Sequence, residues 1–250
     1  MLISITEKCR MGCSHCIDDA RSDSNKFMDR ETFEKAIDFN LKYDNSITIT
    51  GGEPTEHPQF WEYMDYISHK IESKNNFVVS ILTNGMNLSD ADIPKIEQLN
   101  KMGHFLFQVS SIKPYYPIAI DLNQKVFHLP NVFISSKLEI LQPMGRAKTL
   151  KKSSITAKAP NCFNTRSVMR GQKDFHKSII YLRSIGRFCC PQISYDGHIK
   201  VGESTLCPAV AHINDSEKEI ISKICAFKCD GCKELLQGLP PLYRHAIGEQ

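Results

Sequence analysis

Short β-rich runs alternate regularly with amphipathic segments of helical periodicity between residues 2 and 109. Strands that alternate with helices of about 10 to 15 residues are typical of βαβ units, in which the strands are parallel. The sequence therefore predicts an α/β fold with a parallel sheet. The expected strands cover residues 2–6, 46–50, 77–82 and 105–109, and the expected helices cover residues 29–41, 60–71 and 89–102.

The alternation weakens after the fourth expected strand. Prolines and tyrosines at 114–117 interrupt any long helix, and short β-like runs follow at 125–129 and 131–141. The lysine-rich segment 145–159 is expected to be a linker or mobile loop, which either forms a solvated surface or contacts an anionic substrate. Residues 166–185 are expected to be helical.

Length and composition limit the classes of protein to which the chain can belong. It has 250 residues, of which 41% are hydrophobic and 24% are charged, values that are ordinary for a globular protein. This length suits one large domain with a small appendage. A net charge of +3 and a pI of about 8.3 disfavour a nucleic-acid-binding protein, whose basic residues would gather on one face.

The sequence carries no sign of export or of insertion into a membrane. It has no apolar run of about 18 residues or more, and no basic region, apolar run and cleavage site precede the first expected strand. Ten Cys residues would suit a secreted disulfide scaffold, but such scaffolds are much shorter. We therefore expect a cytoplasmic protein whose thiols are reduced.

Three Cys residues lie close together directly after the first expected strand. Cys9, Cys13 and Cys16 converge only if their loop curls around a common object, for which a metal centre is the first candidate. Structural zinc usually takes four protein ligands from two separated pairs. Three local thiolates instead suit a cubane iron–sulfur cluster with one open iron, although most such clusters have four Cys ligands. Zinc or another metal completed from elsewhere in the chain, and a purely structural role, stay open at this point.

A second short motif, Gly51-Gly52-Glu53-Pro54, directly follows the second expected strand. Its glycines permit a close approach of backbone to a ligand, its carboxylate can accept a hydrogen bond from an ammonium group, and its proline stiffens the turn. Standing alone, such a tetrapeptide is more often a structural turn. Its position matters because α/β proteins place their chemistry at the carboxyl ends of parallel strands.

Together, the two motifs resemble those of the radical S-adenosylmethionine (SAM) superfamily. The resemblance rests on Cys-x3-Cys-x2-Cys at 9–16 and on Gly-Gly-Glu-Pro at 51–54, and it covers residues 2–141 in the order of that family. It implies a partial (β/α)6 barrel of the TIM type. It also implies that Cys9, Cys13 and Cys16 hold a [4Fe-4S] cluster whose open iron binds the amino and carboxylate groups of SAM.

The resemblance also assigns expected roles to residues around the cofactor. His15 holds the place of an aromatic residue near adenine, and Gly51–Pro54 match the segment that receives the SAM amino group. Residues that close the third and fourth strands match positions near the site in relatives, although they also suit ordinary turns. Arg146 belongs to a Gly-Arg segment similar to one late in relatives' barrels and is given no role, and no catalytic acid or base is predicted. The expected cofactor-binding residues are His15, Gly51, Gly52, Glu53, Pro54, Thr83, Asn84, Ser110 and Ser111.

The last third of the sequence combines a hairpin signal with many Cys residues. Asp196-Gly197 lies between β-rich arms that run from Ile193 to Val201, which predicts a β-hairpin. Cys residues flank this hairpin, and a Cys-x2-Cys pair follows it. Four such thiols can hold zinc or a cubane cluster. The candidate ligands are Cys190, Cys207, Cys229 and Cys232, and either Cys189 or Cys225 could replace one of them.

Residues 186–235 resemble the twitch domain, a short relative of the SPASM domain that follows some radical SAM barrels. The resemblance implies one auxiliary [4Fe-4S] cluster at those Cys residues. The expected organisation is a radical SAM core at 1–145, a linker and helix at 146–185, and a twitch-like iron–sulfur domain at 186–250.

The function implied by the resemblance is that of an oxidoreductase or peptide maturase. A reduced cluster would cleave SAM to a 5'-deoxyadenosyl radical, which would abstract hydrogen from a peptide or small molecule, with net oxidation or crosslinking favoured by an auxiliary cluster. Expected partners are a reductant such as flavodoxin or ferredoxin and, because the first expected strand starts at residue 2, a separate protein that presents a peptide. The alternatives are an iron–sulfur scaffold or regulator and a radical SAM enzyme that modifies nucleic acid.

Overall fold

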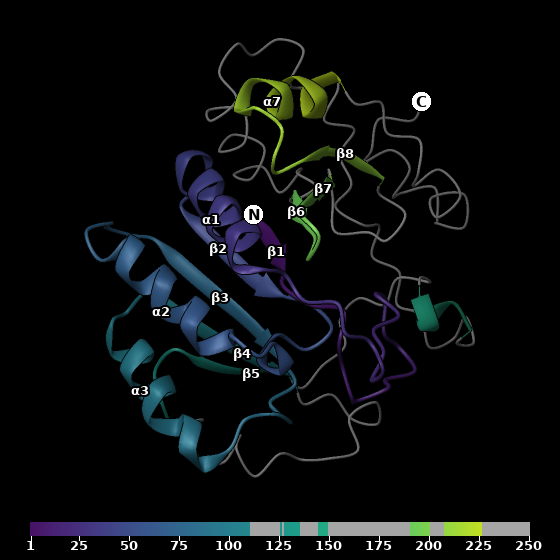
Figure 1. Ribbon diagram of the computed structural model, residues 1–250. Coiled ribbons are helices and arrows are strands. Elements are labelled where there is room, and N and C mark those ends of the chain that lie inside the picture. The colour runs from purple at the N-terminus through teal and green to yellow at the C-terminus, as the bar shows by residue number, and fades with distance from the viewer. Residues whose placement is uncertain (111–125, 127, 136–144, 150–190, 201–207, 227–250) are drawn as a thin grey trace, which may run out of the picture.

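The computed structural model shows the architecture around the two motifs (Figure 1). It describes residues 1–110, 126, 128–135, 145–149, 191–200 and 208–226. The expected helix at 166–185 lies outside these ranges, as do Ser111, Cys189, Cys190, Cys207, Cys229 and Cys232.

One eight-stranded sheet organises the described part of the chain, in the order β5-β4-β3-β2-β1-β6-β7-β8. Neighbouring strands from β5 to β6 are parallel, whereas β7 and β8 are added antiparallel. The parallel α/β arrangement is thus confirmed, and the described strands form an open sheet. The strands are β1 (Leu2–Ser4), β2 (Ser46–Thr50), β3 (Val78–Thr83), β4 (Phe105–Ser110), β5 (Val132–Ser135), β6 (Gln192–Ile193), β7 (His198–Lys200) and β8 (Ala209–His212).

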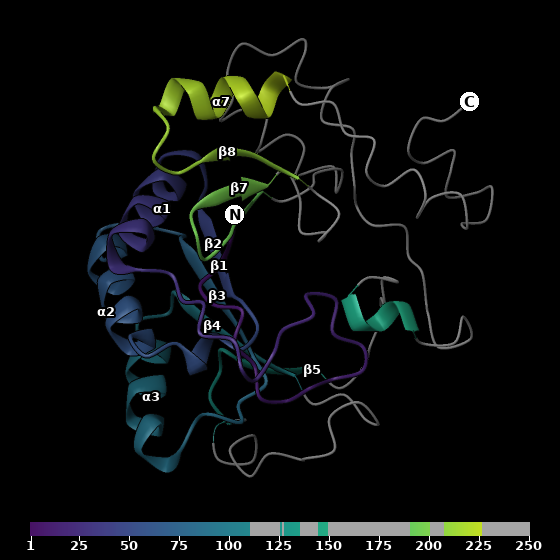
Figure 2. The same cartoon turned by 45° about the vertical axis from the view of Figure 1, so that its right-hand side comes forward.

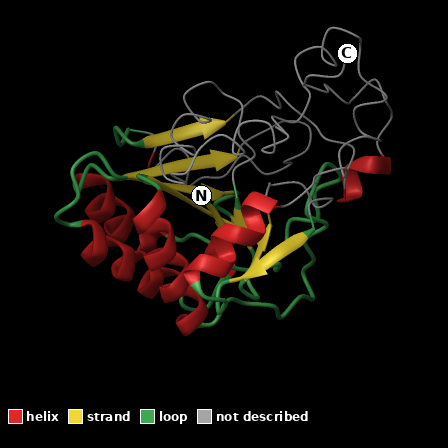
Figure 3. Ribbon diagram, turned by 90° about the horizontal axis from the view of Figure 1, so that it is seen from above, coloured by secondary structure: helices red, strands yellow, loops and turns green. Residues whose placement is uncertain are grey.

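Helices α1 (Arg30–Tyr43), α2 (Phe60–Ile71) and α3 (Ile93–Lys101) cover one face of the parallel strands (Figures 2 and 3). Helix α1 begins at Arg30, one residue after the expected start, because the Asp29 side chain accepts a hydrogen bond from the Thr32 amide at 2.8 Å and caps the first turn. Helix α3 begins later than expected, at Ile93, since residues 90–92 form a short 3-10 turn and Pro94 is tolerated only in the first turn of a helix.

A single row of buried apolar residues runs across all eight strands and forms the centre of the core. Each member is paired in register with the next, and none is more than 8% exposed. Because paired residues lie on the same face of a sheet, the row presents one continuous apolar surface. In strand order it consists of Val132, Phe107, Ile81, Ile49, Ile3, Ile193, Ile199 and Ala211.

The expected hairpin at 193–201 is confirmed, with Asp196-Gly197 at its turn, but it does not stand apart from the core. Strand β6 pairs with β1 and thereby continues the main sheet. The β-like run expected at 125–129 is wrong, because residue 126 is helical and 128–129 belong to a turn, whereas the run expected at 131–141 contains β5. Residues 145–149 form a 3-10 helix, η3, at the start of the expected linker.

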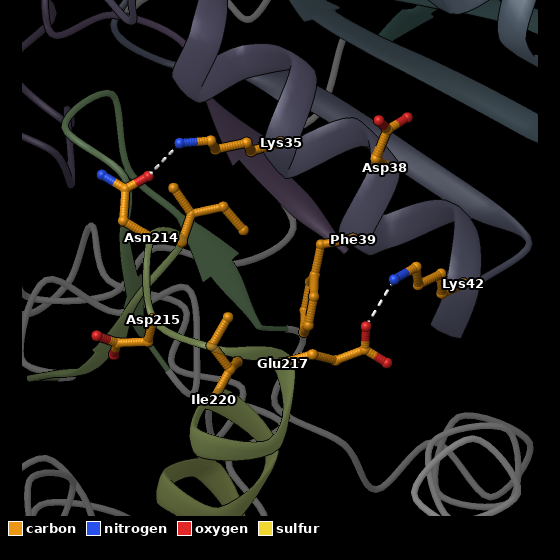
Figure 4. Close-up of a pocket in the computed structure, with 9 residues that line it drawn as sticks. Lys35, Asp38, Phe39, Lys42, Asn214, Asp215, Glu217 and Ile220 are labelled. Atoms are coloured by element: carbon orange, nitrogen blue, oxygen red, sulfur yellow. Dashed lines mark hydrogen bonds and ion pairs between the residues drawn. The ribbon is translucent and has the colours of Figure 1, made fainter.

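Besides the pairing of β6 with β1, a contact between α1 and α7 (Glu217–Ala226) joins the C-terminal part of the described chain to the core. A cavity of about 340 Å³ lies there, over Phe39, Ile213 and Ile220 (Figure 4). The Lys42 ammonium donates to the Glu217 carboxylate at 2.6 Å across it. Within the described ranges, no helix has the length and apolar character that a membrane span requires.

Candidate functional site

The candidate site lies where the carboxyl ends of β1, β2 and β3 meet at one edge of the sheet (Figure 2). Parallel pairing brings together segments that are far apart in the sequence. The loop that carries the three Cys residues follows β1, the Gly-Gly-Glu-Pro segment follows β2, and Thr83-Asn84 closes β3. We call residues 9–20 the Cys loop.

The base of the Cys loop is held by backbone hydrogen bonds between its two arms. The Cys9 amide donates to the Arg21 carbonyl at 3.0 Å, and the Arg21 amide donates to the Glu7 carbonyl at 3.2 Å. Cys9 is buried at this base, and Cys13 and Cys16 are half-buried farther along the loop. His15 lies between them and is also buried.

Glu53 is the centre of a buried hydrogen-bond network that joins the ends of β2 and β3. One of its carboxylate oxygens accepts from the Thr55 amide at 3.1 Å and from the hydroxyls of Thr55 and Thr83, both at 2.6 Å. The other oxygen accepts from the Asn84 amide at 2.6 Å. With four donors from its own chain and an exposure of 1%, the carboxylate is suited to position these strand ends.

Asn84 connects the Glu53 network to the first Cys residue. Its backbone amide donates to Glu53, and its side-chain amide nitrogen lies 3.6 Å from Cys9 Sγ. A donor beside this sulfur is suited to stabilise a thiolate. The structure thus brings Cys9, Glu53, Thr83 and Asn84 into one buried group. Ser110 lies at the end of β4 and has no hydrogen bond to this group among the contacts described.

Burial governs the ionisation of the groups at this edge. It raises the pKa of the Cys9 thiol to about 11, and the nearby charge of Glu53 acts in the same direction. Burial likewise raises the pKa of Glu53, against the effect of its hydrogen-bond donors. The pKa of His15 is lowered by burial and by the positive charge of Arg146. Binding of a metal centre at Cys9 would therefore displace a proton from its sulfur.

The two glycines of the motif allow its backbone to lie directly against the backbone of residues 6–8. A Cβ on Gly51 would lie 2.5 Å from the Thr6 carbonyl oxygen, and one on Gly52 would lie 2.4 Å from that of Lys8. The amides of Gly52 and Glu53 donate to those same oxygens at 2.8 and 2.7 Å. The motif is therefore joined backbone to backbone to the segment directly before the Cys loop.

Gly52→Ala is expected to lower the free energy of unfolding by about 1 to 3 kcal/mol, as overpacking in a well-packed interior commonly does. The cause is steric, because the added methyl group would overlap the Lys8 carbonyl. Urea denaturation measures the change. Gly103→Ala is the control, since a Cβ there meets nothing within 4 Å and only the left-handed backbone (φ +75°) opposes it. An effect of Gly52→Ala no larger than that of the control would contradict the steric account.

Sequence reasoning missed contacts that hold the first half of the Cys loop. The Arg10 amide donates to the Glu56 carboxylate at 2.9 Å, and the Arg10 guanidinium contacts Asn87. Glu56 follows the Gly-Gly-Glu-Pro segment, and Asn87 follows the end of β3. The available signal in the sequence was that Glu56 lies two residues after Pro54 and that Asn87 lies three residues after Asn84.

The donor set at the Cys loop consists of three thiols, of which Cys9 is buried and Cys13 and Cys16 are half-buried. Soft thiolates on one loop suit an iron–sulfur cluster chemically. Within the described part of the chain, no three His, Cys, Asp or Glu side chains are arranged to hold one metal ion.

Comparison with known proteins identifies the family of this fold and motif. The model of the radical SAM superfamily matches residues 3–172. An uncharacterized protein of Methanocaldococcus jannaschii is 33% identical over 103 residues, which are 40% of this chain and 35% of that protein. The antilisterial bacteriocin subtilosin biosynthesis protein AlbA of Bacillus subtilis is 32% identical over 84 residues, or 32% of this chain and 17% of AlbA. A probable GTP 3',8-cyclase of Methanococcus aeolicus is 34% identical over 90 residues, or 34% of this chain and 29% of the cyclase.

Solved structures show the same fold at low sequence identity. BtrN in complex with AdoMet and 2-DOIA is similar with a TM-score of 0.54 and 12% identity, covering 98% of this chain and 88% of BtrN. Native anSMEcpe with bound AdoMet and Cp18Cys peptide gives a TM-score of 0.51 and 15% identity, covering 93% of this chain and 84% of that one. The matches to the three curated relatives each span about a third or less of the relative's length.

Proposed function

Because the chain belongs to the radical SAM superfamily, we propose that it uses a [4Fe-4S] cluster at Cys9, Cys13 and Cys16 to cleave SAM and to abstract hydrogen from an organic substrate. The observation that carries this proposal is the junction of the Cys loop with the Gly-Gly-Glu-Pro segment. Backbone hydrogen bonds from Gly52 and Glu53 reach the residues directly before the Cys loop, and Asn84, which donates to Glu53, also contacts Cys9 Sγ.

Bound at Cys9, Cys13 and Cys16, a reduced cluster would supply one electron for the cleavage of a carbon–sulfur bond of SAM to methionine and a 5'-deoxyadenosyl radical, which would take a hydrogen atom from the substrate. The residues of this chain bind and orient. Glu53 holds the ends of β2 and β3 in place, and Asn84 stabilises the sulfur of Cys9. His15 and the strand-end residues Thr83, Ser110 and Ser111 are proposed to line the SAM site beside Gly51–Pro54.

The proposed substrate class is a peptide or a small molecule, with net oxidation or crosslinking as the outcome. Two similar proteins carry peptide-related names, namely the subtilosin biosynthesis protein and anSMEcpe with its bound peptide, and BtrN is bound to 2-DOIA. A mild net charge of +3 gives no preference for nucleic acid. A flavodoxin or ferredoxin as reductant, and a separate protein that presents a peptide, are the proposed partners.

The auxiliary cluster belongs to the same proposal. Its proposed ligands are Cys190, Cys207, Cys229 and Cys232. They belong to a proposed twitch-like domain at 186–250, which follows a partial barrel core at 1–145 and a linker and helix at 146–185. The hairpin β6–β7 and the later helix α7 support a twitch-like arrangement, since they supply its hairpin and helix in the right order. Such a cluster would accept the electron of a substrate radical or bind substrate.

Cys229→Ala is expected to lower the iron content of the reconstituted protein from about eight to about four atoms per chain, because each cubane carries four irons. Colorimetric iron and sulfide analysis measures the change. Cys162→Ala is the matched control, since Cys162 lies outside both proposed ligand sets and should retain the full content. Equal iron in Cys229→Ala and the wild type would exclude Cys229 as a ligand.

The proposal as a whole is tested by supplying the cluster-loaded protein with SAM and dithionite without oxygen. Formation of 5'-deoxyadenosine is expected. A scaffold or regulator that only stores a cluster would bind iron and leave SAM intact.

A further inference from the structure

The second half of the Cys loop is held by Arg146, which lies about 130 residues later in the chain. The Arg146 amide donates to the Cys16 carbonyl at 2.9 Å, and its Nε donates to the Cys13 carbonyl at the same distance. A terminal nitrogen of its guanidinium donates to the Ala20 carbonyl at 2.6 Å. One residue thus fixes three carbonyl groups of the loop.

The position of Arg146 at the start of η3 (Gly145–Thr149) explains how its backbone reaches the loop. The first amides of a helical turn have no partner within the turn, and here the Arg146 and Ala147 amides both point to the Cys16 carbonyl, at 2.9 and 3.4 Å. Gly145 permits this contact. A Cβ on it would lie 2.6 Å from the carbonyl oxygens of both Cys16 and Ile17, and its φ is +51°.

The guanidinium is also well placed electrostatically. Only 28% of the Arg146 side chain is exposed. Its guanidinium forms an ion pair at 3.2 Å with Asp19, which belongs to the same Cys loop. Arg suits this role because its rigid fork donates several hydrogen bonds in fixed directions, whereas Lys offers a single flexible ammonium. The contacts with Cys13 and Ala20 use two different nitrogens of that fork.

The two halves of the Cys loop are therefore fixed by different parts of the chain. Glu56 and Asn84 contact the half that begins with Cys9, through the Arg10 amide and the Cys9 sulfur. Arg146 contacts the half that contains Cys13 and Cys16. Three thiolates that each hold a different iron must keep their mutual spacing, and both sets of contacts restrain the backbone that carries them.

We infer that Arg146 is a positioning residue for the cluster, which fixes the backbone at Cys13 and Cys16 so that their thiolates face it together with Cys9. The inference rests on the proposed cluster at these three Cys residues. Outer groups that orient metal ligands typically contribute about 10- to 100-fold to metal affinity, and we expect an effect in this range.

The test compares iron loss to a chelator from reconstituted wild-type protein, Arg146→Lys and Arg146→Gln. The fraction of iron that the wild type releases and Cys13→Ala lacks is assigned to the loop cluster. Both Arg146 variants should release this fraction about 10- to 100-fold faster than the wild type. Arg146→Lys should release it as fast as Arg146→Gln, although lysine keeps the positive charge. The electron paramagnetic resonance signal of the reduced loop cluster should also broaden, because Cys13 and Cys16 adopt several positions.

Arg21→Lys is the matched control. Arg21 lies at the exit of the same loop and also pairs with Asp19, at 3.6 Å, but its side chain is 69% exposed and it should release iron at the wild-type rate. Circular dichroism of the apo-proteins checks that every variant is folded. Wild-type rates and spectra in folded Arg146→Lys and Arg146→Gln would overturn the inference. A wild-type protein that binds no iron at the loop would overturn the proposed function as well.

Discussion

Cys13→Ala is expected to remove about four iron atoms per chain and to abolish cleavage of SAM, because an open cubane cluster with three thiolates has none to spare. Cys13 lies in the middle of the Cys loop, between the buried base at Cys9 and the half-buried Cys16. No second thiol in the described part of the loop can replace it, since Cys9 and Cys16 are already proposed ligands.

Iron analysis and the visible absorbance of the anaerobically reconstituted protein measure this loss. Ser14→Ala is the control, because it changes the neighbouring exposed residue of the same loop and leaves the three thiols intact. It should retain the iron and colour of the wild type. Full iron content in Cys13→Ala, in a folded sample, would contradict the assignment of Cys13 as a ligand.

Glu53→Gln is expected to lower the free energy of unfolding by about 2 to 4 kcal/mol, since a buried donor left without an acceptor costs about 1 to 3 kcal/mol and hydrogen bonds to a charged group are stronger than neutral ones. The Glu53 carboxylate accepts four hydrogen bonds on two oxygens. Glutamine has one such oxygen. If the glutamine oxygen faces Thr55 and Thr83, the glutamine NH2 group faces the backbone N–H of Asn84, so that two hydrogen-bond donors oppose each other.

Chemical denaturation of the apo-protein measures the stability of Glu53→Gln without any contribution from a cluster. Glu62→Gln is the matched control, because Glu62 lies on the exposed side of α2 and its substitution should change stability by less than about 0.5 kcal/mol. A Glu53→Gln protein as stable as this control would show that the network does not tie β2 to β3. Retained stability with lost SAM binding would instead favour direct contact of the carboxylate with SAM.

The parallel core could be predicted from the sequence because its signals are local. The run Ser46–Thr50 alternates and forms β2 with the expected bounds, and Asp196-Gly197 forms the expected hairpin turn. Helix α1 begins at Arg30, one residue after its expected start. In each case the residues that decide the structure lie within a few positions of one another.

The rest depended on contacts between distant segments, for which single residues give no signal. The pairing of β6 with β1 joins residues about 190 positions apart. Arg146 recognises backbone carbonyls of the Cys loop, which every residue type presents. The motif Gly51-Gly52-Glu53 predicted the place of the site, but only the structure shows that its glycines approach the chain itself and that Glu53 is surrounded by donors of its own chain.

Cleavage of SAM at the Cys loop and the Gly-Gly-Glu-Pro segment is tested by the amount of 5'-deoxyadenosine that the anaerobic, cluster-loaded protein forms with SAM and dithionite, measured by liquid chromatography and mass spectrometry. We predict that the wild type forms 5'-deoxyadenosine and that Cys13→Ala forms none above the background without protein. A wild-type protein with a full loop cluster that forms no 5'-deoxyadenosine, or a Cys13→Ala variant that forms as much as the wild type, would contradict the claim.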